Sequence, residues 1–125
     1  MTNASKQRLG IVLSTVTEGS PQEFVEIGQL AEANGYESVF VNEGRGDALA
    51  CAEAIALGTQ RIDTGTNIAN IYFRHPCLAA ATTRIVAELS AGRFILGLGM
   101  SHRSMLSSLG IDMGNARDTL QNYIE

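Results

Sequence analysis

Small polar residues and glycines follow the apolar runs that the sequence predicts as strands. In the stretch GRFILGLGMSH, residues 92–102, the apolar pattern ends at Gly99, and Ser101 and His102 come next. Glycine lets a backbone approach a ligand closely, although GLGMSH lacks the GxGxxG spacing of a dinucleotide-binding loop. Parallel α/β proteins bind ligands at the carboxyl ends of their strands, which predicts a small-molecule site here. The candidates at the four strand ends are Ser14, Thr15, Asn42, Glu43, Gly44, Asn67, Ile68, Gly99, Met100, Ser101 and His102.

Four consecutive strand–helix units are predicted to position these residues. Ser20, Pro21 and Glu23 have the spacing of a capping box with proline in the first turn. Pro76 opens a later helix and Asn115 caps the last one. Strictly alternating units imply a parallel sheet in a single domain, residues 1–125. The predicted strands are 9–14, 38–41, 62–66 and 94–98, and the predicted helices are 21–34, 47–59, 76–91, 103–109 and a last one that runs into the terminus.

Helical spacing predicts one apolar face on the first helix and one on the third. The first helix carries its apolar residues at positions 24, 27, 30 and 31, and the third at 78, 81, 85 and 89.

The order of the strands decides whether one face of the sheet is bare. If the order is 1-2-3-4, right-handed crossovers put every helix on one face. The other face would then expose Ile11, Phe40 and Ile95, or their neighbours, and so large an apolar face is unstable on a monomer. The sequence therefore predicts either a missing partner, or a rearranged strand order with helices on both faces, as in open doubly wound sheets of the Rossmann or flavodoxin type.

Composition narrows the classes of partner. The chain has 125 residues, a net charge of −4 and no cluster of Lys or Arg, so we expect neither nucleic acid nor a membrane as partner. No apolar run of about 18 residues is present, and a cytoplasmic location is the default expectation. Cys51 and Cys77 stand alone, outside any metal-binding spacing. We expect both to pack as small apolar residues and predict no metal site.

Three stretches resemble a known family. They are GTNIANIYFRHP at 65–76, ELSAGRFILGLG at 88–99 and LGIDMGNARDTL at 109–120. From Leu9 to about Leu120, the chain resembles the N-terminal half of the luciferase-like monooxygenase superfamily, whose fold is a (β/α)8 TIM barrel. Such a barrel takes roughly 250 residues, so the resemblance implies a half-barrel.

The resemblance also implies a cofactor. VNEGRGDAL at 41–49 and IANIYFRHP at 68–76 look closest to the branch that uses the deazaflavin coenzyme F420, which includes methylene-tetrahydromethanopterin reductases. Other branches use FMN and oxygen. The implied function is a fragment or ancestor-like half of a flavin- or deazaflavin-dependent oxidoreductase, catalysing hydride transfer or monooxygenation, and weak or inactive alone. The alternative is a non-catalytic α/β folding unit, or a weak flavin- or anion-binding module with rearranged strands.

Residue roles follow from the same resemblance. The Asn67–Ile68 peptide bond is expected to be cis, forming a bulge under the cofactor ring; the alternative is an ordinary strand exit with Asn67 in a turn. Glu43 matches an acidic residue of many relatives and is the catalytic candidate, as a contact to ring or substrate, or else a solvated loop carboxylate. The family often has His at the next position, and Gly44 stands here, which argues against luciferase-type base catalysis.

The segment after the fourth strand is expected to lie near the coenzyme. By resemblance it comprises Met100, Ser101, His102 and Arg103. His102 would donate to a phosphate or a ring carbonyl, or would be a partly exposed loop residue. Arg103 is the better phosphate partner on charge grounds, or else lies along a helix. Later strands of the family supply part of the phosphate site and much of the substrate pocket, so two copies pairing as a homodimer would restore only some of the pocket.

Arginines outside these strand ends are expected to be structural. Arg74, before Pro76, is expected to pair with a nearby carboxylate, and Arg93 is expected at the bottom of the barrel.

Overall fold

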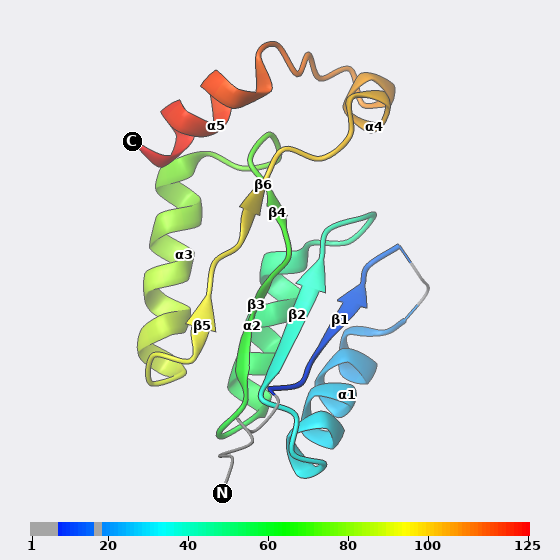
Figure 1. The fold of residues 1–125 in the computed structure, drawn as a ribbon, viewed down its shortest axis with the longest axis vertical. Coiled ribbons are helices and arrows are strands. Elements are labelled where there is room, and N and C mark those ends of the chain that lie inside the picture. The colour runs from blue at the N-terminus through cyan, green and yellow to red at the C-terminus, as the bar shows by residue number, and fades with distance from the viewer. Residues whose placement is uncertain (1–7, 17–18) are drawn as a thin grey trace, which may run out of the picture.

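A computed structural model describes residues 8–16 and 19–125 (Figure 1). Four parallel strands form the main sheet in the order β1-β2-β3-β5. This sequential order is that of a half-barrel, and it makes the rearranged, doubly wound alternative wrong. The strands are β1 (Gly10–Ser14), β2 (Ser38–Asn42), β3 (Asp63–Thr66) and β5 (Phe94–Ile95), and a second parallel pair comprises β4 (Ala69–Asn70) and β6 (Leu98–Gly99).

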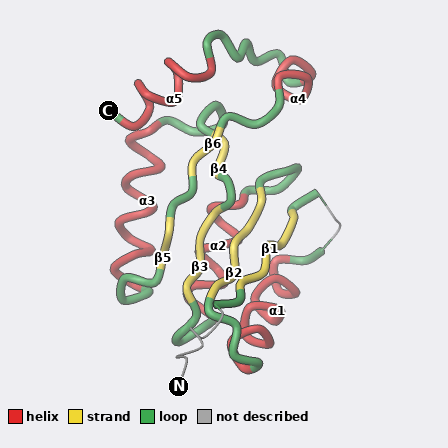
Figure 2. The backbone as a smooth tube through the Cα atoms, viewed as in Figure 1, coloured by secondary structure: helices red, strands yellow, loops and turns green. Residues whose placement is uncertain are grey.

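The second pair continues two strands of the first sheet after an interruption, which the sequence did not predict (Figure 2). Asn67 and Ile68 separate β3 from β4, and Leu96 and Gly97 separate β5 from β6. The Thr66 hydroxyl donates to the Gly97 carbonyl over 2.8 Å and accepts from the Gly97 N–H over 3.1 Å. A Cβ on Gly97 would lie 2.1 Å from the Thr66 carbonyl oxygen, so this crossing of backbones requires glycine.

The helices begin where their caps predict. They are α1 (Pro21–Ala33), α2 (Ala48–Gly58), α3 (Pro76–Leu89), α4 (Arg103–Ser108) and α5 (Ala116–Ile124). Ser20 and Glu23 form the predicted capping box, and Asn115 accepts from the Asp118 N–H. The segment of α4 and α5 lies beyond the carboxyl ends of the strands (Figure 1). Across the described ranges, no helix has the length and apolar character needed to cross a membrane.

One face of the sheet packs against helices and the other is open. Val39 and Val41 are fully buried against the helices, with Ile11 and Leu13 packed on the same core. The strand register aligns Val12, Phe40, Gly65 and Ile95 as one row on the opposite face. Val12 is 54% exposed and Ile95 46% exposed, so the predicted bare face exists. Ile11 itself points to the helices, and its neighbour Val12 lies on the open face, which is the alternative that the prediction named.

The apolar faces of the outer helices are only partly used for the core. On α1, Phe24 and Ala31 are buried, whereas Ile27 and Leu30 are exposed. On α3 the buried residues are Ala79 and Val86. The apolar face predicted there is exposed at Leu78, Ala81, Ile85 and Leu89.

Candidate functional site

Three of the predicted site residues come together at the carboxyl edge of the main sheet. Ser14 pairs with Asn42 in the register of β1 and β2. The Asn67 N–H donates to the Val41 carbonyl over 2.8 Å, which places Asn67 beside Asn42. Asn42 and Asn67 are exposed and Ser14 is half-buried, so this edge presents a hydroxyl and two amides. We call Ser14, Asn42 and Asn67 the polar rim.

Below the polar rim lies an apolar floor, the row of Val12, Phe40, Gly65 and Ile95. A Cβ on Gly65 would lie 3.0 Å from the Phe40 ring and 2.1 Å from the Ile95 carbonyl oxygen. The absence of a side chain at Gly65 therefore lets the Phe40 ring lie close to the neighbouring strand. An apolar surface with a few polar groups at one edge suits a flat, mostly apolar ligand.

The Asn67–Ile68 peptide bond is cis, as predicted, so the alternative of an ordinary strand exit is wrong. Ile68 is half-buried and lies against the backbone of β6, because a Cβ on Gly99 would approach its side chain to 2.6 Å. Two predicted positions, Ile68 and Gly99, are therefore in contact beyond the polar rim.

Glu43 is not the solvated loop residue that was one alternative. Its side chain is 1% exposed and forms an ion pair with Arg74, itself 10% exposed. The Arg74 guanidinium donates to both carboxylate oxygens, at 2.9 and 2.5 Å. The Ala48 N–H donates to one of these oxygens over 3.3 Å, and the Asn70 N–H donates to the other. Glu43 thus joins the end of β2 to the starts of α2 and α3, which favours a positioning role.

Arg74 has the carboxylate partner that the sequence predicts, and a second one in Asp47, at 3.0 Å. The hydrogen bonds that Arg74 donates to Glu43 are the main cause that raises the pKa of Arg74, and burial opposes this rise without cancelling it. The guanidinium is therefore a permanent charge at this position.

A buried amide and two tyrosines next to this ion pair were not predicted. Asn70 is 1% exposed, and its Oδ1 accepts from the Tyr72 N–H over 3.0 Å. The Tyr72 hydroxyl donates to the Met113 carbonyl over 2.7 Å, and the Tyr123 hydroxyl donates to the Arg74 carbonyl over 3.0 Å. These bonds hold the α4–α5 segment on the β4–α3 connection. The aromatic pattern of IYF at 71–73 was the available signal, but the Met113 carbonyl that Tyr72 bonds lies 41 residues away, and Tyr123 lies 49 residues from Arg74.

The residues predicted to reach the coenzyme after the fourth strand lie in the α4 segment. His102 is exposed at the start of α4 and makes no capping bond with its side chain. Arg103 is exposed and donates to the Gly114 carbonyl over 3.2 Å, within its own segment. Met100 and Ser101 are half-buried, and the Ser101 hydroxyl lies 3.4 Å from the Met105 sulfur. These contacts bring none of the four residues to the polar rim.

The comparisons with known proteins agree on one family. The sequence profile of the family described as luciferase-like monooxygenase matches residues 7–125. The chain is 31% identical over 98 residues to a 5,10-methylenetetrahydromethanopterin reductase of Methanolobus tindarius, covering 77% of this chain and 30% of that protein. It is 35% identical over 95 residues to a putative coenzyme F420-dependent oxidoreductase of Mycobacterium tuberculosis, covering 75% of this chain and 27% of that protein.

A solved structure shares the fold at lower identity. It is the oxygenating constituent of 3,6-diketocamphane monooxygenase from Pseudomonas putida, in complex with FMN. The TM-score is 0.77 at 18% identity, and the match covers 94% of this chain and 37% of that one. The chain therefore spans between 27% and 37% of the length of these proteins.

Proposed function

Because this chain belongs to the luciferase-like monooxygenase family, we propose that it forms the N-terminal half of a flavin or deazaflavin site in an oxidoreductase. The observation that carries the proposal is the polar rim, Ser14, Asn42 and Asn67, above an open apolar floor. Its hydroxyl and amides would bond to the polar edge of the ring, and Ile68 with Gly99 would bound the ring at the neighbouring strand end. The bound cofactor would supply hydride transfer or oxygen chemistry, and the chain would orient it.

We favour the deazaflavin F420 over FMN as the cofactor. The support is the 35% identical relative that is described as F420-dependent, against an FMN complex that is only 18% identical. Met100, Ser101, His102 and Arg103 stay candidates for contacts to the coenzyme. Glu43 touches ring or substrate only if its bonds to Arg74 open, since both its oxygens already accept hydrogen bonds. Because the chain spans 27–30% of these relatives, we expect the 125 residues alone to bind weakly and to show little or no activity.

A fluorescence titration of the chain with F420 and with FMN tests the proposal. Weak but saturable binding is expected, tighter for F420 than for FMN. Asn42→Leu should weaken this binding about tenfold, because the loss of one well-placed hydrogen bond costs about 1.4 kcal/mol. Asn122→Leu on the exposed surface of α5 is the matched control and should bind as the unaltered chain does.

Two results would contradict the proposal. Absence of binding at millimolar cofactor would favour the alternative, a non-catalytic folding unit. Equal competition by inorganic phosphate would indicate a generic anion site, since phosphate has no ring to place on the apolar floor.

A further inference from the structure

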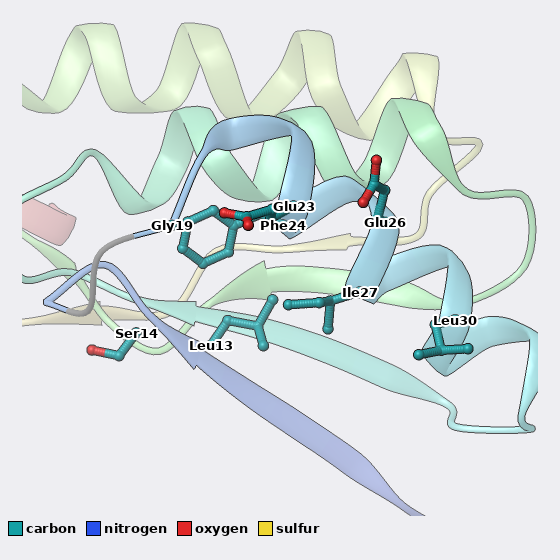
Figure 3. Close-up of a pocket in the computed structure, with 8 residues that line it drawn as sticks. All are labelled: Leu13, Ser14, Gly19, Glu23, Phe24, Glu26, Ile27 and Leu30. Atoms are coloured by element: carbon teal, nitrogen blue, oxygen red, sulfur yellow. The ribbon is translucent and has the colours of Figure 1, made fainter.

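Both open edges of the half-barrel carry apolar side chains that face away from the central helix. At the first edge, Val25 and Gln29 of α1 contact Gly58 of α2. Ile27 and Leu30 therefore lie on the opposite side of α1, above the free edge of β1. They line a hollow of about 500 Å³ together with Leu13, Ser14, Gly19, Glu23, Phe24 and Glu26 (Figure 3). We call this the α1 edge.

The second edge has the same character. Val86 of α3 is buried and Ala87 packs on the core, so these residues face the sheet and α2. Leu78, Ile85 and Leu89 recur at helical spacing on the side away from α2, and all three are more than half exposed. The strand at this edge is β5, the last strand of the four-stranded sheet. We call this the α3 edge.

We propose that a second copy of this chain covers both edges, with the α1 edge of each copy against the α3 edge of the other. Among the described strands, β1 and β5 each have a neighbour on one side only. In a two-fold arrangement, β1 of each copy would lie beside β5 of the other, which makes two identical junctions. The result would be eight parallel strands, the number in a closed (β/α)8 barrel. The proposal rests on the fold and needs no bound cofactor.

The exposed area supports two junctions for each copy. The chain exposes 7918 Å². A folded monomer of its mass, 13.3 kDa, exposes about 6,450 Å². The excess of about 1,500 Å² is close to two interfaces of standard size, which bury about 800 Å² on each partner. The protruding α4–α5 segment holds part of this excess, so the figure is an upper bound for the two junctions.

The charges on the helices favour pairing of an α1 edge with an α3 edge over pairing of two α1 edges. Glu23 and Glu26 line the hollow of the α1 edge, and α1 carries no basic residue. Two α1 edges brought face to face would oppose these carboxylates. The α3 helix carries one exposed arginine, Arg84, and one exposed carboxylate, Glu88, so its charges balance whereas those of α1 are all negative. An α1 edge therefore meets a more favourable charge on α3 than on another α1.

The arrangement would also complete the rim of the candidate site. The polar rim of one copy lies at the carboxyl ends of three of its four strands, and the second copy would supply the same residues, Ser14, Asn42 and Asn67, across the barrel axis. Association itself is measured without cofactor, so a failure of cofactor binding and a failure of pairing are separate results.

Light scattering across a wide range of concentrations tests the pairing directly. We expect twice the mass of the 13.3 kDa chain. Leu30→Glu and Leu89→Lys should each halve this mass, because each places a charge in both junctions. A mixture of the two variants should regain the mass of a pair, since one junction then joins two unaltered edges and the other joins Glu with Lys. Leu57→Glu, an exposed position on α2, is the control and should keep the doubled mass.

Three outcomes would overturn the proposal. The first is a monomer at every concentration. The second is a pair that only Leu30→Glu disrupts, which would mean two α1 edges facing one another. The third is open assemblies that grow with concentration. Circular dichroism of each variant establishes that a halved mass reflects lost pairing of a folded chain.

Discussion

The best-connected side chain of the candidate site is Glu43. Four donors reach its carboxylate, and they come from Arg74 and from the backbone of Ala48 and Asn70. A buried carboxylate with this many donors stabilises the ends of several elements at once, and removing its charge leaves the guanidinium of Arg74 short of a partner. Asn42 of the polar rim directly precedes Glu43 in the chain.

Glu43→Gln tests that role at the scale of one residue. The substitution keeps the size of the side chain but removes the charge that faces the Arg74 guanidinium. We expect the free energy of unfolding to fall by about 3 kcal/mol, the lower end of the range for a broken buried ion pair, because Asp47 still faces Arg74. Urea denaturation at constant protein concentration measures it. The control Glu88→Gln removes an exposed carboxylate and should change stability by less than about 0.5 kcal/mol. Equal effects of the two variants would contradict the role assigned to Glu43.

The sequence could not predict the burial of Glu43. Its partner Arg74 is 31 residues away, and a carboxylate after a strand has the same local pattern whether it is solvated or paired. The expectation that Arg74 pairs with a carboxylate is confirmed, but the spacing did not say which carboxylate it would meet. The cis bond at Asn67 was predicted from the resemblance alone, since no local pattern marks it.

At the scale of elements, the connection between α2 and β3 is held by side chains from other parts of the chain. Arg93 donates to the carbonyls of Ala56, Thr59 and Ile62, which agrees with its predicted structural role at the amino end of the strands. Glu32 of α1 accepts from the N–H groups of the same turn, residues 60–62. At this turn the Glu32 carboxylate therefore accepts hydrogen bonds from backbone N–H groups, and the Arg93 guanidinium donates hydrogen bonds to backbone carbonyls.

Glu32 predicts a pH dependence of stability. Partial burial pushes its pKa upward, but the three backbone donors outweigh burial, and the pKa lies below its ordinary value of 4.5. A lowered pKa in the folded state stabilises the fold above pH 4.5, and this contribution is lost as the pH falls through the folded pKa. In urea denaturation at pH 7 and below pH 4.5, Glu32→Gln should lose less stability on acidification than the unaltered chain. Parallel pH profiles would contradict the assignment.

Helix positions were predicted well, and the faces of the outer helices were not. Capping residues act within one turn, so Ser20, Pro76 and Asn115 mark their helices whatever surrounds them. The direction of an apolar face depends on neighbours distant in sequence. Periodicity on α1 and α3 cannot separate a strip that faces the sheet, such as Phe24 and Ala31, from one that faces a free edge, such as Leu30.

At the scale of the whole molecule, sequential strand order leaves two free edges and one open apolar face. Helices cover only the face that carries Val39 and Val41, and the face with Val12 and Ile95 stays exposed. A single copy has no further element to place there within the described ranges. Stability of the whole molecule is therefore expected to depend on what these surfaces contact, and for the proposed pair that is the protein itself.

The proposed pairing predicts that stability rises with protein concentration. A chain that unfolds from a pair must also dissociate, so mass action moves the midpoint of urea denaturation upward as the concentration increases. For the unaltered chain and for Leu57→Glu we expect this shift, and for Leu89→Lys we expect a midpoint that is lower and independent of concentration. The midpoint of urea denaturation reports on pairing through the unfolding equilibrium, so it tests the pairing independently of the mass measured by light scattering. A midpoint that stays constant for the unaltered chain would mean that the folded unit is one copy, with its edges stable in water.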